Sequence, residues 1–571
     1  MKRKKLGVVA LGSLLALSLA ATACSKNEKE TATDSPKPSG SAAASGSPAA
    51  SAKPVDPLAK YDPPIEVTTV RSIDGNFKFA AGDSLDSNVW TKIFEKDYGI
   101  KVKNLWTVDV TQYHQKLNVS IASGDLPDFL LVNKEEMNRL AESGMLEDLT
   151  KVWEQYASPF GKGLMQEDGG IGMKAATYGG KLVGIPATAN NGGVSTAQMI
   201  YIRTDWLQKL NLPEPKTLDD VFKVATAFAK QDPDGNGKAD TYGLAINKDF
   251  LDMGHGSLVG LFNSYHTFTD IWLKDAGGKL VYSSLQKELK DPLKKLQELY
   301  KDGVLDKEFG VKPVAKIGED IAAGRIGLAF GNVADGGVYQ KDSHTKDPKA
   351  QWKTIQLVSN DGKPAIPQLS DTAGNFYVVK KGAKHPEAMV KLADIYWKLY
   401  YETNYAPNPN PYITDAATGI FPARYVPVAI DSLNTNLTAY RLLQEALKNK
   451  DGSKLGFPAT VHWDRMTKFL AGDDTMWFSN MVFGNPDGSS YSTIDKYDKA
   501  KIGQYNAFQG PATPTMADKL PTLKKKEIET FTKIIMGDAG VDEFDKFVSD
   551  FKTLGGDTIE KEVNDWYAKN K

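Results

Sequence analysis

The sequence has one cysteine, Cys24, among its 571 residues. A lone cysteine excludes an internal disulfide and a cysteine-based metal cluster. The six histidines are scattered, with no HExxH segment and no pair spaced by four residues that would favour zinc. GxSxG, Walker-type and GxGxxG segments are also missing, so no recognisable hydrolase or nucleotide-binding pattern is present.

Neither sign of charge dominates the chain. Lysine and arginine number 70 against 71 aspartates and glutamates, for a net charge of -1. No basic field would attract nucleic acid, so we expect no nucleic-acid partner. With 41% hydrophobic and 25% charged residues the composition is that of a globular protein, and the length indicates about two to four folding units.

No apolar run reaches the roughly 20 residues of a membrane-spanning helix. The longest, residues 6–20, follows four basic residues and precedes Ala21, Thr22, Ala23 and Cys24. This order predicts a signal peptide over residues 1–23. It resembles a lipobox, with Ala21 where leucine is usual, and therefore predicts lipidation at Cys24. The alternative is an ordinary signal cut after Ala23 that leaves a free thiol.

A linker follows the cysteine. Residues 24–64 are rich in Ser, Ala, Pro and Gly and nearly free of bulky apolar side chains. Such a segment cannot bury enough apolar surface to offset its ordering entropy, so it is expected to be a flexible spacer. Anchor and spacer together predict a protein on the extracellular face of the cell membrane, held there by lipid only.

Strand and helix patterns alternate from residue 65 onward. Residues 65–71 and 100–108 alternate apolar and polar side chains, and residues 129–133 form a continuous apolar run typical of a parallel strand buried on both faces. A helix is expected up to Tyr98 with Gly99 as its C-cap, and another after the capping box of Thr217 and Asp220. Further elements are expected as helices at 113–122, 385–401 and the C-terminus, and as strands at 201–206, 325–331 and 376–381. The pattern indicates an α/β fold.

Several longer segments occur in an order typical of one protein family. They are YHQKLNVSIASGDLPDFLLV, GKLVGIPATAN followed by YIRTDWLQKLNLPEPKTLDDV, RIGLAFGN, GNFYVVKKGAKHPEAMVKLADIYW, and a closing block with FQGPATPTM and GGDTIEKEVNDWY. Together they resemble extracellular solute-binding proteins of family 1, the maltodextrin-binding type. The nearest likeness is to the large lipoprotein subgroup of Gram-positive bacteria.

This resemblance implies a type II periplasmic-binding-protein-like fold, with two lobes that close on a ligand around a hinge. Lobe 1 is expected over residues 65–190 and about 372–435, and lobe 2 over 191–371 and about 436–571. The chain would cross between them near 186–199, 370–374 and 431. The implied function is capture of a carbohydrate, such as an oligosaccharide, for an ABC importer. The protein would be a monomer that delivers its ligand to the permease subunits.

Two other functions remain open. A secreted carbohydrate-active enzyme would also be rich in aromatic and acidic residues. The sequence has no recognisable set of catalytic residues, so we expect that the protein is not an enzyme. A surface receptor that presents its ligand to a sensor kinase would share every feature named so far.

An EF-hand-like loop is the sharpest local motif. Its oxygen donors stand at alternate positions, as calcium requires, and Gly237 allows the sharp turn. The expected ligands are Asp232, Asp234, Asn236, the backbone carbonyl of Lys238, and Asp240. Position twelve is Gly243 instead of a bidentate glutamate, so a further oxygen must come from Thr241, water or elsewhere. The alternative is a polar turn; the resemblance favours a structural Ca²⁺.

Sugar receptors combine stacking aromatic rings with polar side chains that bind hydroxyl groups. Trp477 precedes a glycine-rich stretch and is predicted to lie on a binding loop, whereas Trp206 and Trp566 are expected in the core. Loops after strands and between lobes supply the other ligand-binding candidates. These are Asp83, Asn190, Asn191, Arg203, Asn332, Asp335, Asp371 and Asn375. For Arg203 the alternative is a hinge ion pair.

Overall fold

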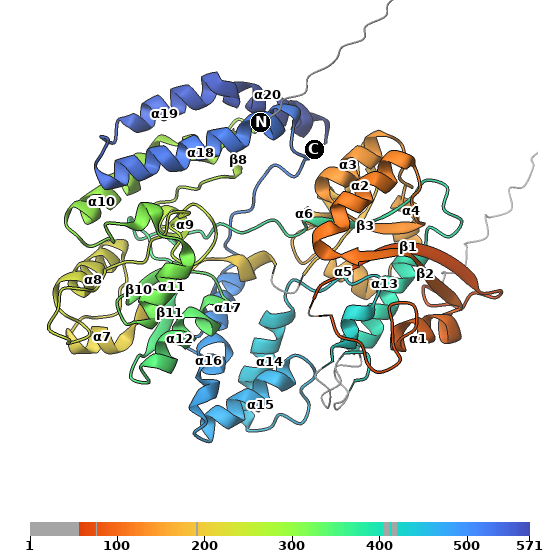
Figure 1. Ribbon diagram of the computed structural model, residues 1–571, viewed down its shortest axis with the longest axis horizontal. Coiled ribbons are helices and arrows are strands. Elements are labelled where there is room, and N and C mark those ends of the chain that lie inside the picture. Colours follow the sequence, from red (N-terminus) through yellow and green to blue (C-terminus); the bar gives the residue numbers. More distant parts are fainter. Residues whose placement is uncertain (1–55, 76, 190–191, 403–409, 414–419, 571) are drawn as a thin grey trace, which may run out of the picture. The chain divides into compact units, whose positions relative to one another are not determined.

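The computed structural model describes residues 56–75, 77–189, 192–402, 410–413 and 420–570 (Figure 1). The predicted signal peptide and Cys24 lie outside this part of the chain. The strands are β1 (Ile65–Ile73), β2 (Ile100–Asp109), β3 (Phe129–Asn133), β4 (Thr177–Tyr178), β5 (Lys181–Leu182), β6 (Ile185–Pro186), β7 (Met199–Arg203), β8 (Trp272–Lys274), β9 (Leu280–Tyr282), β10 (Leu328–Gly331), β11 (Trp352–Ile355) and β12 (Asn375–Val379).

The helices account for most of the remaining regular structure. They are α1 (Val89–Tyr98), α2 (Tyr113–Ser123), α3 (Lys134–Glu142), α4 (Thr150–Tyr156), α5 (Pro159–Leu164), α6 (Ile171–Ala175), α7 (Thr204–Lys209), α8 (Leu218–Lys230), α9 (Val259–Ser264), α10 (Lys290–Lys301), α11 (Val314–Ala322), α12 (Tyr339–Lys346), α13 (Ala388–Trp397), α14 (Thr435–Asn449), α15 (Ala459–Leu470), α16 (Trp477–Ser479), α17 (Ser490–Ala500), α18 (Pro514–Met536), α19 (Glu543–Phe551) and α20 (Asp557–Lys569). The expected α/β class is confirmed.

Helix ends follow the local sequence. At α1 the Asn88 side chain accepts hydrogen bonds from the first-turn amides, and Gly99 ends the helix in the left-handed conformation. At α8, Thr217 and Asp220 form the predicted capping box. The buried face of α8 includes the expected apolar side chains from Leu218 to Phe228.

The first core cluster is built from residues 67–185 and 373–430. Strand β12 lies between β3 and β6 and runs antiparallel to both, while β1 and β2 pair in parallel. Residues 129–133 are therefore a buried strand as predicted, but their pairing with β12 is antiparallel. The partner strand enters from a distant part of the chain, so neighbouring sequence does not reveal its direction. In Figure 1, α13 lies among these early elements.

The second and third core clusters cover opposite faces of the sheet β10-β7-β11. Because side chains alternate along a strand, Ile200 and Ile202 pack with α8 and the C-terminal helices, whereas Met199 and Tyr201 pack with α14 and α17. Strand β7 is antiparallel to both neighbours. It ends at Arg203, and α7 begins directly after it, so the expected strand at 201–206 is shorter than predicted.

The chain changes core cluster in three segments. Residue 185 belongs to the first cluster and residue 197 to the third, 369 to the third and 373 to the first, and 430 to the first and 437 to the third. We call residues 186–196, 370–372 and 431–436 the first, second and third crossing segments. Among the described helices, none combines the length and apolar character needed to cross a membrane.

Candidate functional site

The three crossing segments are hydrogen-bonded to one another or to their flanks. The amide of Asp431 donates to the Thr188 carbonyl at 3.0 Å, and the Thr188 hydroxyl donates back to the Asp431 carbonyl at 2.5 Å. The amide of Ser370 donates to the Thr196 hydroxyl at 2.9 Å. Segments far apart in sequence thus meet at one place.

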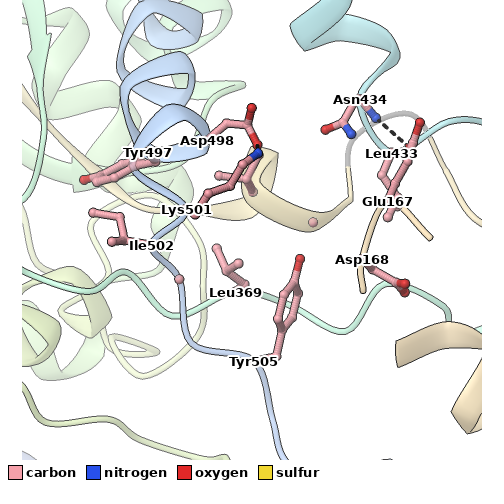
Figure 2. A pocket seen from close by; sticks show the side chains of 13 residues that line it. Glu167, Asp168, Leu369, Leu433, Asn434, Tyr497, Asp498, Lys501, Ile502 and Tyr505 are labelled. Atoms are coloured by element: carbon pink, nitrogen blue, oxygen red, sulfur yellow. Dashed lines mark hydrogen bonds and ion pairs between the residues drawn. The ribbon is translucent and has the colours of Figure 1, made fainter. Parts of the chain in front are cut away.

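A pocket opens where these segments meet. We call it the junction pocket and define it by Glu167, Asp168, Asn434, Asp498, Lys501 and Tyr505, among others (Figure 2). In Figure 2 the Tyr505 ring lies below Lys501 and Glu167, and its hydroxyl points toward the space between them. Residues from both sides of the crossing segments therefore line one hollow.

Most charges in the junction pocket are already engaged by the protein. Asp168 accepts hydrogen bonds from two backbone amides and from the Thr372 hydroxyl, the last at 2.6 Å. Asp498 accepts from Lys501 at 3.0 Å and from Arg441 at 2.7 Å. A ligand would therefore meet these groups as fixed, oriented dipoles.

Glu167 is exposed and Tyr505 is partly buried, and the pKa values of both lie above their ordinary values. Burial raises the pKa of Glu167, and the hydrogen bond from the Ser432 hydroxyl, 2.7 Å long, opposes that rise. Burial, with a smaller effect of Asp168, raises the pKa of Tyr505 to about 12, so its hydroxyl stays protonated. Within the described part of the chain this hydroxyl has no hydrogen-bond partner, which leaves it available to a ligand.

A second pocket lies on one side of the third crossing segment. We call it the aromatic pocket; its lining includes Tyr396, Tyr400, Phe421, Phe457, Asp431, His462 and Arg465. Tyr396 and Tyr400 come from α13 and its extension, and His462 and Arg465 from α15. Rings and hydrogen-bonding groups from distant segments thus face one volume.

The imidazole of His462 is neutral and incompletely bonded. Burial, reinforced by the positive charge of Arg465, lowers the pKa of His462 to about 3. Its ring stacks on Phe483 at 3.6 Å between centroids, and its Nδ1 atom is buried without a hydrogen-bond partner among the described residues. A buried polar atom of this kind is costly unless something bonds to it.

A third pocket has a different lining. We call it the basic pocket; it includes Lys174, Lys274, Gln504, Tyr505, Asn506 and Trp566. It shares Gly503 and Tyr505 with the junction pocket. A fourth pocket, around Phe160 and Tyr401, shares Glu167 with the junction pocket and Phe457 with the aromatic pocket. Each pocket thus shares lining residues with the next, in the order basic, junction, fourth and aromatic. We call these four pockets the row of pockets.

Two predicted site residues lie close to this row. Asp371, in the second crossing segment, is exposed; its carboxylate accepts from the Gln509 side chain at 3.3 Å and lies 4.0 Å from Lys134 Nζ. Asn375 is exposed and begins β12. Burial lowers the pKa of Lys134, and Asp371 opposes that shift. Asp371 is thus linked to Gln509 of the basic pocket, and the Asn375 carbonyl accepts from the Ala187 amide of the first crossing segment at 2.9 Å.

Asp83 does not line any of the four pockets. Asp83 lies in the loop before α1, where its carboxylate is 3.5 Å from Lys92 Nζ. Asn190 and Asn191 fall outside the described residues.

Asn332 and Asp335 belong to a buried network at the end of β10. His255 Nδ1 lies 2.8 Å from the Asp335 carboxylate, which also accepts from the Asn332 amide at 2.9 Å. The Tyr201 hydroxyl donates to the Asn332 carbonyl at 2.7 Å. The protein itself thus engages the Asp335 carboxylate.

Arg203 lies at the opposite end of that sheet from Asn332. The register pairs Leu328 with Ile202 and Gly331 with Met199, so the crossing enters β7 at the end far from Arg203. The buried guanidinium donates to Asp205 at 2.8 Å and lies 3.6 Å from Asp347. Arg203 is therefore ion-paired at the end of β7 that lies away from the crossing segments, so this is not the expected hinge ion pair, and Arg203 does not line the four pockets.

Trp477 is in the core and not on an open loop. Only 6% of its surface is exposed, and its ring stacks on His344 at 4.3 Å in the third cluster. The short helix α16 turns the indole inward, which a reading of its polar neighbours does not anticipate. Trp206 is buried as expected, whereas Trp566 is only partly buried and lines the basic pocket.

The pocket-lining residues that sequence analysis missed come from segments without a motif. Glu167 follows α5, Asn434 precedes α14, and Tyr505 lies in a loop after α17. Tyr401, which lines the fourth pocket, stands at the end of the helix expected over residues 385–401.

A model of the bacterial extracellular solute-binding protein family matches residues 90–397, more than half of the chain. The chain belongs to this family. The resemblance seen in the sequence is thereby confirmed, and binding of a solute outside the cell is the activity that the family name describes.

Curated relatives extend the match over most of this solute-binding protein. The polygalacturonan/rhamnogalacturonan-binding protein YtcQ of Bacillus subtilis (strain 168) is 25% identical over 485 residues, covering 84% of this chain and 88% of YtcQ. Lipoprotein LipO of the same organism is 24% identical over 497 residues, covering 85% of this chain and 90% of LipO.

Solved structures share the fold. An HMO binding ABC-transporter associated solute-binding protein from Bifidobacterium longum infantis has a TM-score of 0.59 at 19% identity, covering 89% of this chain and 99% of its own. An EF-hand mutant of the S. pneumoniae substrate-binding protein FusA, in complex with fructo-nystose, has a TM-score of 0.50 at 18% identity, covering 89% and 100%. The expected periplasmic-binding-protein-like class is confirmed.

The EF-hand-like loop of this solute-binding protein is folded by its own acidic side chains. The Asp232 carboxylate accepts from the amides of Gly235 and Asn236, both at 3.0 Å, and of Gly237 at 3.1 Å. The Asn236 amide group donates to Asp234 at 2.6 Å and to Asp240 at 3.1 Å. The carboxylates of Asp234 and Asp240 thus meet at the Asn236 NH₂ group, whereas the Asn236 oxygen accepts from the Lys238 amide at 2.7 Å. Among the described residues no three His, Cys, Asp or Glu side chains group as a metal site.

Packing explains the glycine at position twelve. A Cβ atom on Gly243 would stand 2.1 Å from the Ala225 carbonyl oxygen, so no side chain fits there. The Thr241 hydroxyl cannot readily replace the missing glutamate, because it is buried and donates to the Phe228 carbonyl at 2.7 Å. A further ligand would come from a backbone carbonyl or water.

Proposed function

We propose that this solute-binding protein captures an oligosaccharide in the row of pockets along its crossing segments and delivers it to an ABC importer. The observation that carries the proposal is the aromatic pocket, where four rings face an acid, a guanidinium and a neutral imidazole. The two lobes would be the residue ranges on either side of the crossing segments, 65–190 with about 372–435 and 191–371 with about 436–571.

The chemistry of the aromatic pocket suits a sugar. Pyranose rings have flat C–H faces that stack on Tyr and Phe, and hydroxyl groups that need both donors and acceptors. Asp431 can accept from a ligand, and Arg465 can donate to it. Hydroxyl bonds nearly break even against water, so stacked faces and excluded solvent must supply net affinity.

The names of similar proteins support the same ligand class. YtcQ is described as binding polygalacturonan and rhamnogalacturonan, and FusA was solved with fructo-nystose. The Bifidobacterium longum infantis protein is described as associated with an ABC transporter, which favours permease subunits as partners. In this proposal the protein binds its ligand without chemical conversion, and lobe closure around the hinge signals occupancy to the permease.

Two accessory features complete the proposal. Asp232, Asp234, Asn236, the Lys238 carbonyl and Asp240 would hold a structural Ca²⁺, whose charge would neutralise the converging carboxylates. Cys24 would carry the lipid that keeps the protein at the extracellular membrane face, as the description of LipO as a lipoprotein suggests.

Calorimetric titration with neutral and acidic plant and bacterial oligosaccharides tests the proposal. Phe457→Ala should weaken binding by about 1–2 kcal/mol, since a stacking face is lost. Phe469→Ala is the matched control, because Phe469 is also partly buried but lies outside the four pockets. Equal effects of the two changes, or no binding of any oligosaccharide, would contradict the proposed site.

Two further measurements address the alternatives. Small-angle scattering with a verified ligand should show compaction as the lobes close. Chromatography of that ligand after long incubation should show it unchanged; cleavage products would favour a carbohydrate-active enzyme instead.

A further inference from the structure

The basic pocket differs from its neighbours in the charge of its lining. It contains Lys174 and Lys274 and no aspartate or glutamate. The adjoining junction pocket contains Glu167, Asp168 and Asp498. A ligand that spans both pockets would therefore pass from an acidic to a basic environment.

Both lysines are available to a ligand. Lys174 extends from α6 and Lys274 ends β8; both are exposed, and within the described residues neither ammonium group has an ion pair or hydrogen bond. The next residue, Asp275, uses its carboxylate in its own turn, where it accepts from the Lys279 amide at 2.8 Å. Two ammonium groups thus border the pocket, and neither is paired with a carboxylate of the described residues.

Trp566 supplies a supported ring face beside these lysines. Phe508 packs edge-on against it at 5.1 Å between centroids, and Gly510 lies so close that a Cβ there would stand 2.8 Å from the indole. These contacts hold the ring, which remains partly exposed toward the pocket. Such a ring can stack on the C–H face of a sugar.

Amide groups add donors. The Asn506 side-chain oxygen accepts from the amides of Trp272 at 3.0 Å and Phe508 at 3.1 Å, which fixes the side chain through its oxygen. Its NH₂ group then faces other partners as a pure donor. The basic pocket therefore offers hydrogen-bond donors and positive charges but no carboxylate. This combination suits an anionic ligand better than a neutral polyol.

We propose that the basic pocket binds a uronic acid unit, with the sugar stacked on Trp566 and its carboxylate held by Lys174 and Lys274. The captured solute is then an acidic oligosaccharide, whose neighbouring unit places hydroxyl groups at Tyr505 in the junction pocket. This inference rests on the proposed oligosaccharide capture and names the chemical class of the ligand.

The test uses the mature protein and trimers of galacturonate, mannuronate and glucuronate, with the methyl ester of each trimer and a neutral galactose trimer. The ester keeps the shape and removes the charge. At least one acidic trimer should bind, and its ester should bind more weakly. The double change Lys174→Gln with Lys274→Gln should weaken the acid about 5- to 30-fold and leave the ester nearly unaffected, because partly exposed charge pairs contribute up to about 1 kcal/mol each.

Three comparisons make the result decisive. Lys279→Gln, on the same hairpin but outside the pocket, should leave affinity unchanged. Trp566→Ala should weaken acid and ester alike. Raised salt should reduce acid binding in the wild type more than in the double variant.

The failures of the two proposals can be told apart. If the neutral trimer or the esters bind as tightly as the acids, or if the double variant binds the acids like the wild type, the uronate assignment is overturned while sugar capture stands. If no acidic trimer binds but other oligosaccharides do, the uronate assignment is likewise overturned while sugar capture stands. If nothing in the wider oligosaccharide panel binds, the proposed function itself fails.

Discussion

The hydroxyl of Tyr396, in α13, donates a hydrogen bond of 2.6 Å to the carboxylate of Asp431, in the third crossing segment. Tyr401 approaches the same oxygen at 3.4 Å. Burial raises the pKa of Asp431, and both phenol donors oppose that shift. Helix α13, which belongs to the first core cluster, is thus hydrogen-bonded to the third crossing segment, through which the chain leaves that cluster.

Tyr396→Phe should lower the free energy of unfolding by about 1.5–3 kcal/mol, the usual cost of losing a hydrogen bond to a charged group. Urea denaturation at neutral pH measures the change. Tyr178→Phe is the control, since the Tyr178 hydroxyl has no hydrogen-bond partner among the described residues. An unchanged urea midpoint for Tyr396→Phe would mean that the hydrogen bond from Tyr396 to Asp431 does not stabilise the folded protein.

Trp477→Ala should destabilise the protein by about 3–5 kcal/mol, because it empties a core position packed against His344. Chemical denaturation should show this loss in the ligand-free protein. The sequence suggested the opposite: weaker binding with unchanged stability. That outcome, if measured, would return Trp477 to the ligand site.

Local features of the fold could be predicted, because short-range interactions determine them. The caps of α1 and α8 depend on Asn88, Gly99 and Thr217, each within one turn of the helix end that it shapes. Strand β3 was recognised from its apolar run, but its antiparallel pairing with β12 was not. That pairing depends on a crossing segment that brings distant residues together.

The candidate site was harder to predict for the same reason. Asp371 could be placed beside a crossing because the family resemblance implies one near residues 370–374. Glu167 and Tyr505 meet only in three dimensions, and neither stands in a recognisable motif. Arg203 has the residue type of a ligand contact, yet nearby Asp205 already satisfies it.

Calcium should stabilise the folded protein through the loop at Asp232–Asp240. At a calcium concentration a hundredfold above the dissociation constant, binding adds about 2.7 kcal/mol. Asp234→Ala should abolish the drop in melting temperature that a chelator causes in the wild type. Lys238→Ala is the matched control, because the expected ligand there is the backbone carbonyl. Elemental analysis that finds no calcium in the wild type would refute the assignment.

Cys24→Ser should release the protein from membranes into the medium, since the thiol that would carry the lipid is lost. Fractionation of cells that express the wild-type and variant chains measures the distribution. If the variant still sediments with membranes and resists washing, the anchor is not at Cys24.

Glu527, in α18, is a buried acid with an unsatisfied oxygen. Its Oε1 atom has no hydrogen-bond partner within the described residues, and only 1% of its surface is exposed. Burial raises its pKa from 4.5 to about 8, with a smaller raising effect of Asp270; the Ser284 hydroxyl and Lys524 oppose the shift. The folded protein therefore keeps the carboxyl protonated at neutral pH.

This raised pKa makes stability depend on pH in a defined direction. Below about pH 4.5 both folded and unfolded chains carry the proton, so the contribution of Glu527 is fully present. As pH rises toward 8 only the unfolded state ionises, and the free energy of unfolding falls. At pH 7 the loss of unfolding free energy amounts to about 3 kcal/mol.

Glu527→Gln should remove this loss, so the variant should be more stable than the wild type at pH 7 and nearly equal at pH 4.5. Thermal denaturation at both pH values measures this, with Glu529→Gln, exposed on the same helix, as the control. A variant less stable than the wild type at pH 7 would show that the folded state needs the ionised carboxylate.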